Sequence, residues 1–101
     1  MDRHDLEQIL FELVGNENVY FQPPTGTQLK YPCIVFRLLN VPTRHANNKA
    51  YHWDRAYQVT HIYKDRRKEL IDEFLNRFKL VSFDTRFTSN NMYHDVYTIY
   101  W

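Results

Sequence analysis

The fold of this chain is specified most clearly by its C-terminal stretch, Ser82-Phe-Asp-Thr-Arg-Phe-Thr-Ser-Asn-Asn-Met-Tyr-His-Asp-Val-Tyr-Thr-Ile-Tyr-Trp101. It predicts two strands around a short polar turn at residues 88–91. Side chains alternate between the two faces of a strand, and here both faces carry large residues. Tyr93, Tyr97 and Ile99 share one face with Asp95, and the other face begins at Met92. We therefore expect a sheet that packs on helices through one face and on a partner through the other.

Hydrophobic periodicity in the rest of the chain predicts two helices and two more strands. A first helix over residues 2–14 begins at Asp2 and ends before Gly15. Its buried apolar stripe is predicted to consist of Leu6, Ile9, Leu10 and Leu13. Strands are predicted at residues 31–39 and 54–63, and a second helix, capped by Asp65, reaches residue 78. The second helix is expected to carry an apolar face made of Leu70, Ile71, Phe74, Leu75 and Phe78. The order helix, strand, strand, helix, strand, strand is typical of an α+β fold, with a roughly four-stranded, mostly antiparallel sheet and both helices packed on one face.

Two long connections, at residues 15–30 and 40–53, separate these elements. The first is rich in Gly, Pro and Asn and contains a short extended piece at residues 19–21. The second holds a polar, mildly basic stretch at residues 44–49. Long loops are uncommon in a small domain unless they have a function, so we expect both to contact a neighbouring molecule.

Size and composition limit the possible classes of protein. The 101 residues form one domain, and a hydrophobic content of 44% with 17% aromatics is enough for one core. The net charge of +1 provides no overall field to attract nucleic acid. The single cysteine, Cys33, lies in an apolar run and is expected to be a small buried hydrophobe in a reducing compartment. The charged N-terminus lacks a signal-peptide core and no apolar run is long enough to span a membrane, so we expect a soluble, cytoplasmic protein.

Residues that could carry out catalysis or bind a metal are scattered through the sequence. The five histidines show no paired spacing, and a chain with two glycines has no glycine-rich phosphate loop. There is no G-x-S-x-G motif, and Cys33 lies within a strand rather than at a helix start. His61 interrupts an apolar face, where a hydrogen-bonded core histidine is the commoner role. We therefore expect no catalytic residue, no metal site and no cofactor, and we predict that the protein is not an enzyme.

A cluster of basic residues begins the second predicted helix. Arg66, Arg67 and Lys68 lie in the first turn, where positive charge opposes the helix dipole. They are candidates for contact with an acidic partner, although a solvated basic turn is the simpler interpretation. Together with Arg44 and Lys49 they also leave open a nucleic-acid-binding module as an alternative.

Several stretches of the chain, taken in their order and spacing, resemble a group of small proteins encoded among the head–tail joining and tail genes of long-tailed phages. The resemblance covers most of the chain from Tyr31 onward, and the stretches carry no chemistry. They are Tyr31-Pro-Cys-Ile-Val-Phe36, Arg44-His-Ala-Asn-Asn48, Tyr57-Gln-Val-Thr60, Ser82-Phe-Asp-Thr-Arg-Phe87, Asn90-Asn-Met-Tyr-His-Asp95 and Tyr97-Thr-Ile-Tyr100. The chain departs from the group at His61, where an aliphatic residue is usual, and at Arg66-Arg67, where acidic and proline residues are common.

The resemblance implies a tail terminator, or tail-completion protein, with a fold similar to lambda-type terminators. Such proteins form a ring, typically of six copies, that caps the tail tube protein and presents a surface to the head connector. The implied location is the tail or neck of the virion, assembled in the host cytoplasm, with DNA only passing through the ring. Alternatives are another neck component, such as a stopper, adaptor or minor capsid protein. A ring needs a heterologous interface, and we expect its subunit-interface or lumen residues in the second long loop: Arg44, His45, Asn47, Asn48, Lys49 and Tyr51.

Overall fold

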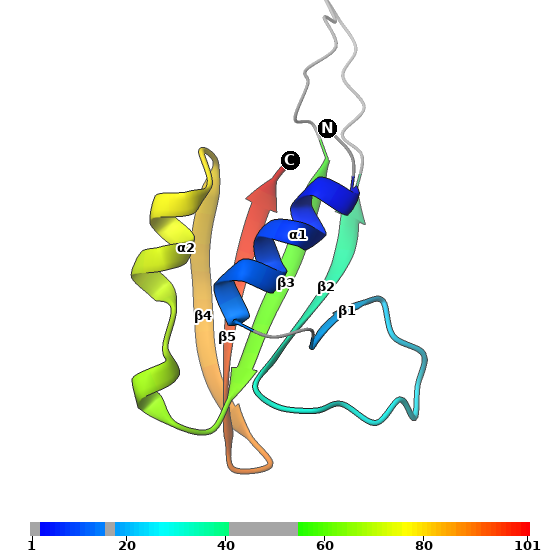
Figure 1. Cartoon of the computed structure of the whole chain (residues 1–101), viewed down its shortest axis with the longest axis vertical. Coiled ribbons are helices and arrows are strands. Elements are labelled where there is room, and N and C mark those ends of the chain that lie inside the picture. The colour runs from blue at the N-terminus through cyan, green and yellow to red at the C-terminus, as the bar shows by residue number, and fades with distance from the viewer. Residues whose placement is uncertain (1–2, 16–17, 41–54) are drawn as a thin grey trace, which may run out of the picture.

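The computed structural model describes residues 3–15, 18–40 and 55–101. Within these residues the chain is an α+β fold, with one five-stranded mixed sheet, two α-helices and a short 3-10 helix (Figure 1). Along the chain these elements are α1 (Arg3–Val14), β1 (Val19–Phe21), β2 (Cys33–Asn40), β3 (Ala56–Tyr63), η1 (Arg66–Lys68), α2 (Ile71–Arg77), β4 (Val81–Ser89) and β5 (Met92–Tyr100). Neither described helix is long and apolar enough to cross a membrane.

The strands lie in the order β1-β2-β3-β5-β4. Strands β2, β3, β5 and β4 are antiparallel to their neighbours, as predicted, whereas β1 pairs in parallel with β2. The prediction of four strands was therefore one short. Residues 19–21 gave only a weak extended signal. They form a strand because Val19 to Phe21 come alongside Ile34 to Phe36, whose backbone groups complete the pairing.

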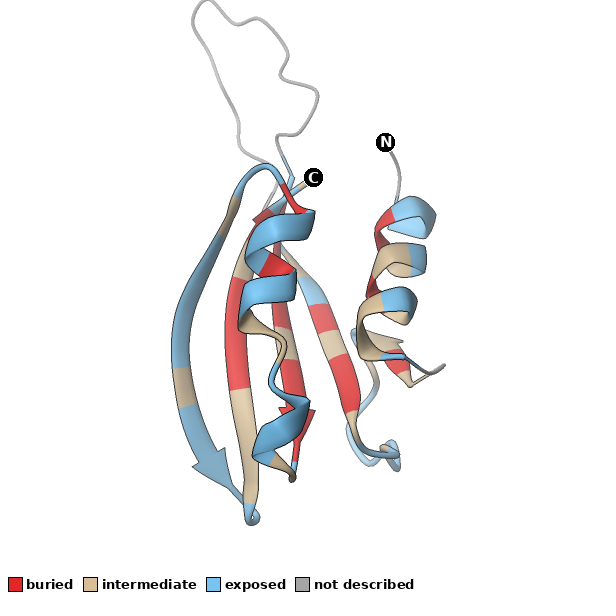
Figure 2. Cartoon of the chain, turned by 60° about the vertical axis from the view of Figure 1, so that its left-hand side comes forward, coloured by how far each residue is buried: buried red, intermediate tan, exposed pale blue. Residues whose placement is uncertain are grey.

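Both helices cover one face of the sheet (Figure 1). Figure 2 shows that buried residues gather on the central strands and on the inner sides of the helices. From α1, Leu6 and Leu10 are fully buried, and from α2, Phe74 stacks on Tyr97 of β5 with ring centroids 4.1 Å apart. The apolar stripe predicted for the first helix is thus confirmed at its centre.

The second predicted helix is divided, which corrects the expectation of one continuous helix to residue 78. Asp65 does act as a cap, because its carboxylate accepts the backbone N–H of Arg67, but it caps the 3-10 helix η1. Glu69 is extended, with φ −58° and ψ 139°, and the α-helix begins only at Ile71. Leu75 was placed on the same face as Phe74 and Phe78, but it is 42% exposed while those two residues are buried.

The two C-terminal strands and their turn were correctly placed by the sequence. β4 and β5 form a hairpin whose tip holds Asn90 and Asn91, both with positive φ (54° and 62°). Asparagine tolerates this left-handed conformation better than most residues, and two such residues match the right-handed twist of a hairpin. A bulge at Asp84 shifts the pairing of β4 with β5 between Phe83 and Thr85.

Candidate functional site

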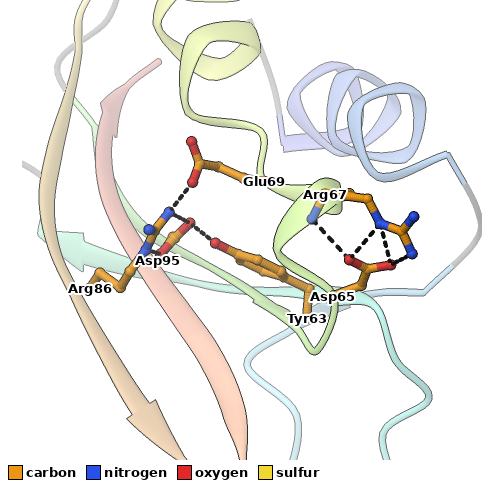
Figure 3. A network of polar contacts seen from close by, with 6 residues as sticks. All are labelled: Tyr63, Asp65, Arg67, Glu69, Arg86 and Asp95. Carbon is orange, nitrogen blue, oxygen red and sulfur yellow. Dashed lines mark hydrogen bonds and ion pairs between the residues drawn. The ribbon is translucent and has the colours of Figure 1, made fainter.

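A carboxylate lies wholly buried in the sheet beneath the helices. Asp95 of β5 has no solvent exposure, and three hydrogen bonds hold its two oxygens (Figure 3). The Tyr63 hydroxyl donates to Oδ2 at 2.6 Å, and the Arg86 guanidinium donates to Oδ1 at 2.6 Å and to Oδ2 at 3.0 Å. This two-pronged arginine contact is the strongest pairing available to a carboxylate. Asp95 thus joins the neighbouring strands β3 and β4 through side chains as well as through the backbone.

The network continues to the junction between the two short helices. Arg86 Nη2 also donates to Glu69 Oε1 at 2.7 Å, and Glu69 occupies the extended break between η1 and α2. The hydrogen bonds to Asp95 and Glu69 raise the pKa of Arg86 above its ordinary value. Burial, and then the hydrogen bond to Asp95, raise the pKa of Tyr63. The guanidinium is therefore charged and the phenol neutral at every ordinary pH.

His61 completes this buried group without joining its hydrogen bonds. It is the cross-strand partner of Asp95, it is 1% exposed, and its ring stacks on Tyr63 with centroids 4.5 Å apart. Its Nδ1 has no hydrogen-bond partner among the described residues, and the same holds for the Tyr97 hydroxyl. Burial lowers the pKa of His61 to about 4, against the opposing charge of Asp95. His61 is therefore a neutral core residue at neutral pH, in the role expected from the sequence.

These geometries indicate what the network does chemically. The Asp95 carboxylate accepts hydrogen bonds on both oxygens and is shielded from solvent, so in this conformation it is not accessible to a substrate. Two surface hollows, one beside Lys64 and Lys68 and one beside Arg37, include none of Asp95, Arg86 and His61 in their walls. The network instead fixes β4 and the η1–α2 junction onto the rest of the sheet.

No described helix covers the sheet face opposite α1 and α2 (Figure 1), although four of its side chains, Cys33, Ala56, Ile62 and Val96, are at most 7% exposed. We call this surface the open face. It consists of alternate residues of β2, β3, β5 and β4: Cys33, Val35, Arg37, Ala56, Gln58, Thr60, Ile62, Met92, His94, Val96, Thr98, Tyr100, Ser82, Asp84, Thr85, Phe87 and Ser89. Tyr100 and Phe87 are 43% and 47% exposed on it, and the Phe87 ring stacks on that of His94 with centroids 4.7 Å apart.

The outer edge of β4 is a second surface that is available for binding a partner. β4 is the last strand of the sheet, so one side of its nine-residue backbone meets no other described strand. Leu80, Phe83 and Phe87, at its start and along it, are 44%, 36% and 47% exposed. The Asp84 bulge and the inward-pointing Arg86 are devices that discourage indiscriminate pairing at an edge.

Of the two sites predicted from the sequence, one lies within the described residues and the other lies outside them. The predicted interface or lumen residues Arg44, His45, Asn47, Asn48, Lys49 and Tyr51 lie outside the described residues. The predicted partner contacts Arg66, Arg67 and Lys68 form η1 and are exposed. Arg67 pairs with Asp65 at 2.9 Å, which lowers the pKa of that carboxyl, and the Arg66 guanidinium lies 5.8 Å from the centroid of the Tyr93 ring.

The buried network was not anticipated from the sequence. One signal was present, because Asp95 stands among the aromatic and aliphatic residues of one face of its strand. Its partners Tyr63 and Arg86 lie 32 and 9 positions away along the chain, and Glu69, which also binds Arg86, lies 17 positions from that arginine. Local patterns do not reveal such pairings.

No group of three or more His, Cys, Asp or Glu side chains in the described part of the chain is arranged to hold a metal ion. Comparisons with protein-family models, with curated proteins and with solved structures found no match to this chain.

Proposed function

We propose that this chain is a structural subunit of a phage virion, a tail terminator or tail-completion protein that assembles into a ring on the tail tube. The observation that carries the proposal is the outer edge of β4, which pairs with no other described strand and is firmly held. Nine residues of backbone end the sheet there, with Phe83 and Phe87 partly exposed. The resemblance of the sequence from Tyr31 onward to small head–tail joining proteins supports the more specific assignment.

A sheet edge is a ready template for pairing with another chain. In a ring, one patch of each subunit meets a different patch on the next subunit, and the rotation closes on itself. The β4 edge suits this task because Arg86 anchors it through Asp95 and Glu69, so the edge is presented in one position. The bulge at Asp84 interrupts the backbone pattern, which favours a partner shaped to match it.

The proposal assigns the remaining predicted contacts to the ring's neighbours. The polar loop from Arg44 to Tyr51 lines a subunit interface or the lumen through which DNA passes. The exposed basic turn of Arg66, Arg67 and Lys68 faces an acidic surface of the tail tube protein or of the head connector. The ring is expected to have six copies, and the protein to reside in the tail or neck of the virion after assembly in the host cytoplasm.

The proposal is tested by imaging the purified protein with and without tail tubes by negative-stain electron microscopy, together with light scattering of the free protein. Rings, free or on tube ends, are the expected result. Phe83→Lys should abolish them, because it places a charge at the open edge. Leu75→Lys is the matched control, because Leu75 is similarly exposed but lies on α2. Arg44→Glu should also weaken assembly.

Other outcomes of this experiment redirect the assignment. Protein that ignores tubes but binds head connectors would be another neck component, such as a stopper, adaptor or minor capsid protein. Protein that ignores both would contradict the virion proposal.

The exposed basic turn η1 keeps nucleic-acid binding as a second candidate function. A protein that binds phosphates through Arg66 and Lys68 loses affinity steeply as salt rises. Electrophoretic shift of DNA at several salt concentrations, with the Arg66→Gln/Lys68→Gln variant as the comparison, measures this directly. Binding that is weak and unchanged in the variant would remove the candidate.

A further inference from the structure

The open face is flat and nearly neutral, which suits packing against another sheet. Its central row runs Val35, Thr60, Val96, Thr85 across four strands, and these side chains are short and β-branched. A row of small branched side chains is flat, and aligned sheets pack about 10 Å apart on such faces. One end of the face carries Tyr100, exposed to 43%.

Charge on this face is confined to two residues, one on the edge strand β4 and one on β2, beside which β1 lies. Arg37 and Asp84 are the charged members of the open face as defined above, and they lie on β2 and β4 respectively. Arg37 Nε donates to Gln58 Oε1 at 3.0 Å, and the Asp84 carboxylate accepts the hydroxyls of Ser82 at 2.7 Å and of Thr98. Arg37, Gln58, Thr98 and Ser82 are successive register partners, so the two charges end one polar row that crosses the sheet.

We propose that a second copy of this chain packs on the open face, about a two-fold axis parallel to the strands. When the axis lies over the line between β3 and β5, it exchanges β2 with β4 and β3 with β5. It therefore places Arg37 of each copy opposite Asp84 of the other, and each polar row lies over its own counterpart. The alternative two-fold axis, perpendicular to the strands, would set Arg37 against Arg37 and Asp84 against Asp84.

The area of the face agrees with this occupant. Four strands about 4.8 Å apart and about 30 Å long present roughly 600 Å² in projection. Side-chain relief adds to the accessible area, and a specific interface of ordinary size buries about 800 Å² on each partner. Nearly neutral composition with complementary charges at the rim is the usual arrangement of such an interface.

This dimer is independent of the proposed role in the phage tail. It uses the broad face of the sheet, whereas the ring proposal rests on the β4 edge and the loop from Arg44 to Tyr51. The two proposals share Asp84 and Phe87 of β4, but only the dimer needs Arg37 of β2. Arg37→Asp therefore tests the dimer separately from the ring.

The dimer is tested by sedimentation equilibrium at concentrations up to about 100 µM, a range that reveals micromolar dissociation constants. The expected wild-type result is a monomer–dimer equilibrium. Arg37→Asp and Asp84→Arg should each raise the dissociation constant about tenfold or more, since each creates a like-charged pair. The double variant Arg37→Asp/Asp84→Arg should restore it to within about threefold of wild type. Arg77→Glu, a charge reversal on the helical side of the molecule, should leave dimerisation unchanged.

A second measurement keeps the test informative if the Asp84 variant folds poorly. A mixture of Val35→Cys and Thr85→Cys proteins, treated with a short bismaleimide, should cross-link more than either protein alone, because the proposed axis brings these two positions together. The native Cys33 is wholly buried and serves as the unreactive internal control. Each of three results would overturn the proposal. The wild-type protein stays monomeric, the charge reversals leave the dissociation constant unchanged, or cross-linking is stronger between identical positions than between Val35→Cys and Thr85→Cys.

Discussion

At the scale of single residues, two buried groups have opposite consequences for stability. The Asp95 carboxylate has its hydrogen bonds satisfied by Tyr63 and Arg86. The neighbouring imidazole of His61 is equally buried, yet its Nδ1 has no hydrogen-bond partner among the described residues. A buried charge that loses its partner is costly, whereas a buried unpaired nitrogen is already a cost that substitution can remove.

We expect Asp95→Asn to lower the free energy of unfolding by about 3 kcal/mol, because it leaves the guanidinium of Arg86 beside a neutral group. Tyr63→Phe removes one hydrogen bond to the same carboxylate and should cost about 1–2 kcal/mol. Urea unfolding followed by circular dichroism measures both. Glu73→Gln, at an exposed carboxylate of α2, is the control. An Asp95→Asn cost no larger than that of Tyr63→Phe would show that the network carries little energy.

His61 predicts how stability depends on pH. Because its pKa is about 4 in the folded protein, below the ordinary 6.5, the unfolded chain binds this proton first as pH falls. The contribution of neutral His61 to the free energy of unfolding is therefore fully present above pH 6.5. It declines between pH 6.5 and about pH 4, by roughly 3 kcal/mol in total.

The variant His61→Phe should remove this part of the acid sensitivity and should be at least as stable as wild type at neutral pH, since it also removes the unpaired nitrogen. Unfolding free energies at pH 7.5 and pH 5 check both statements. Equal losses for wild type and variant between the two pH values would assign the acid sensitivity to other groups.

At the scale of elements, the hairpin tip and the helix break both serve to position β4. Asn90 and Asn91 turn the chain through left-handed conformations so that β4 and β5 pair along their lengths. The break at Glu69 lets its carboxylate reach Arg86, at the cost of a continuous helix. The break at Glu69 thus shortens the helix but allows the contact between Glu69 and Arg86.

The turn gives a prediction at this scale. Asn91→Gly should raise the free energy of unfolding by about 0.5–1 kcal/mol, because glycine adopts the observed φ of 62° without strain and Asn-Gly is the preferred pair in such turns. Asn91→Val should lower it by about 1–2 kcal/mol, since a β-branched residue is strained there. Thermal unfolding of the three proteins tests the order Gly, Asn, Val. Any other order would mean that the side chain of Asn91 matters more than its backbone.

At the scale of the whole molecule, the sheet has one protected and one unprotected face. The helices, with Leu6, Leu10 and Phe74, bury the first face completely at its centre. Cys33 points to the other face, yet it is fully buried, and burial raises the pKa of its thiol to about 12. The thiolate form, which is the reactive one, is therefore scarce in the folded protein.

We therefore expect Cys33 to react with a thiol reagent only when the molecule opens. At neutral pH its labelling rate should be several orders of magnitude below that of the urea-unfolded chain, and Asp95→Asn should accelerate it in proportion to the lost stability. Mass spectrometry over a time course gives the rates. Rapid labelling of the native protein, unaffected by Asp95→Asn, would mean that β2 opens separately from the rest of the sheet.

Local sequence patterns were enough to predict the α+β class, the first helix, and four of the strands with their antiparallel hairpins. These are local properties, because alternation in residues 92–100 and the apolar spacing of Leu6 and Leu10 follow from side-chain geometry over a few residues. Three features became visible only in the tertiary structure: the parallel pairing of β1, the break at Glu69 and the network around Asp95. Each depends on groups that lie far apart in the chain, and only the folded sheet brings them together. The same reason explains why Arg37 and Asp84 are seen as the two ends of one row only after the strand order is known.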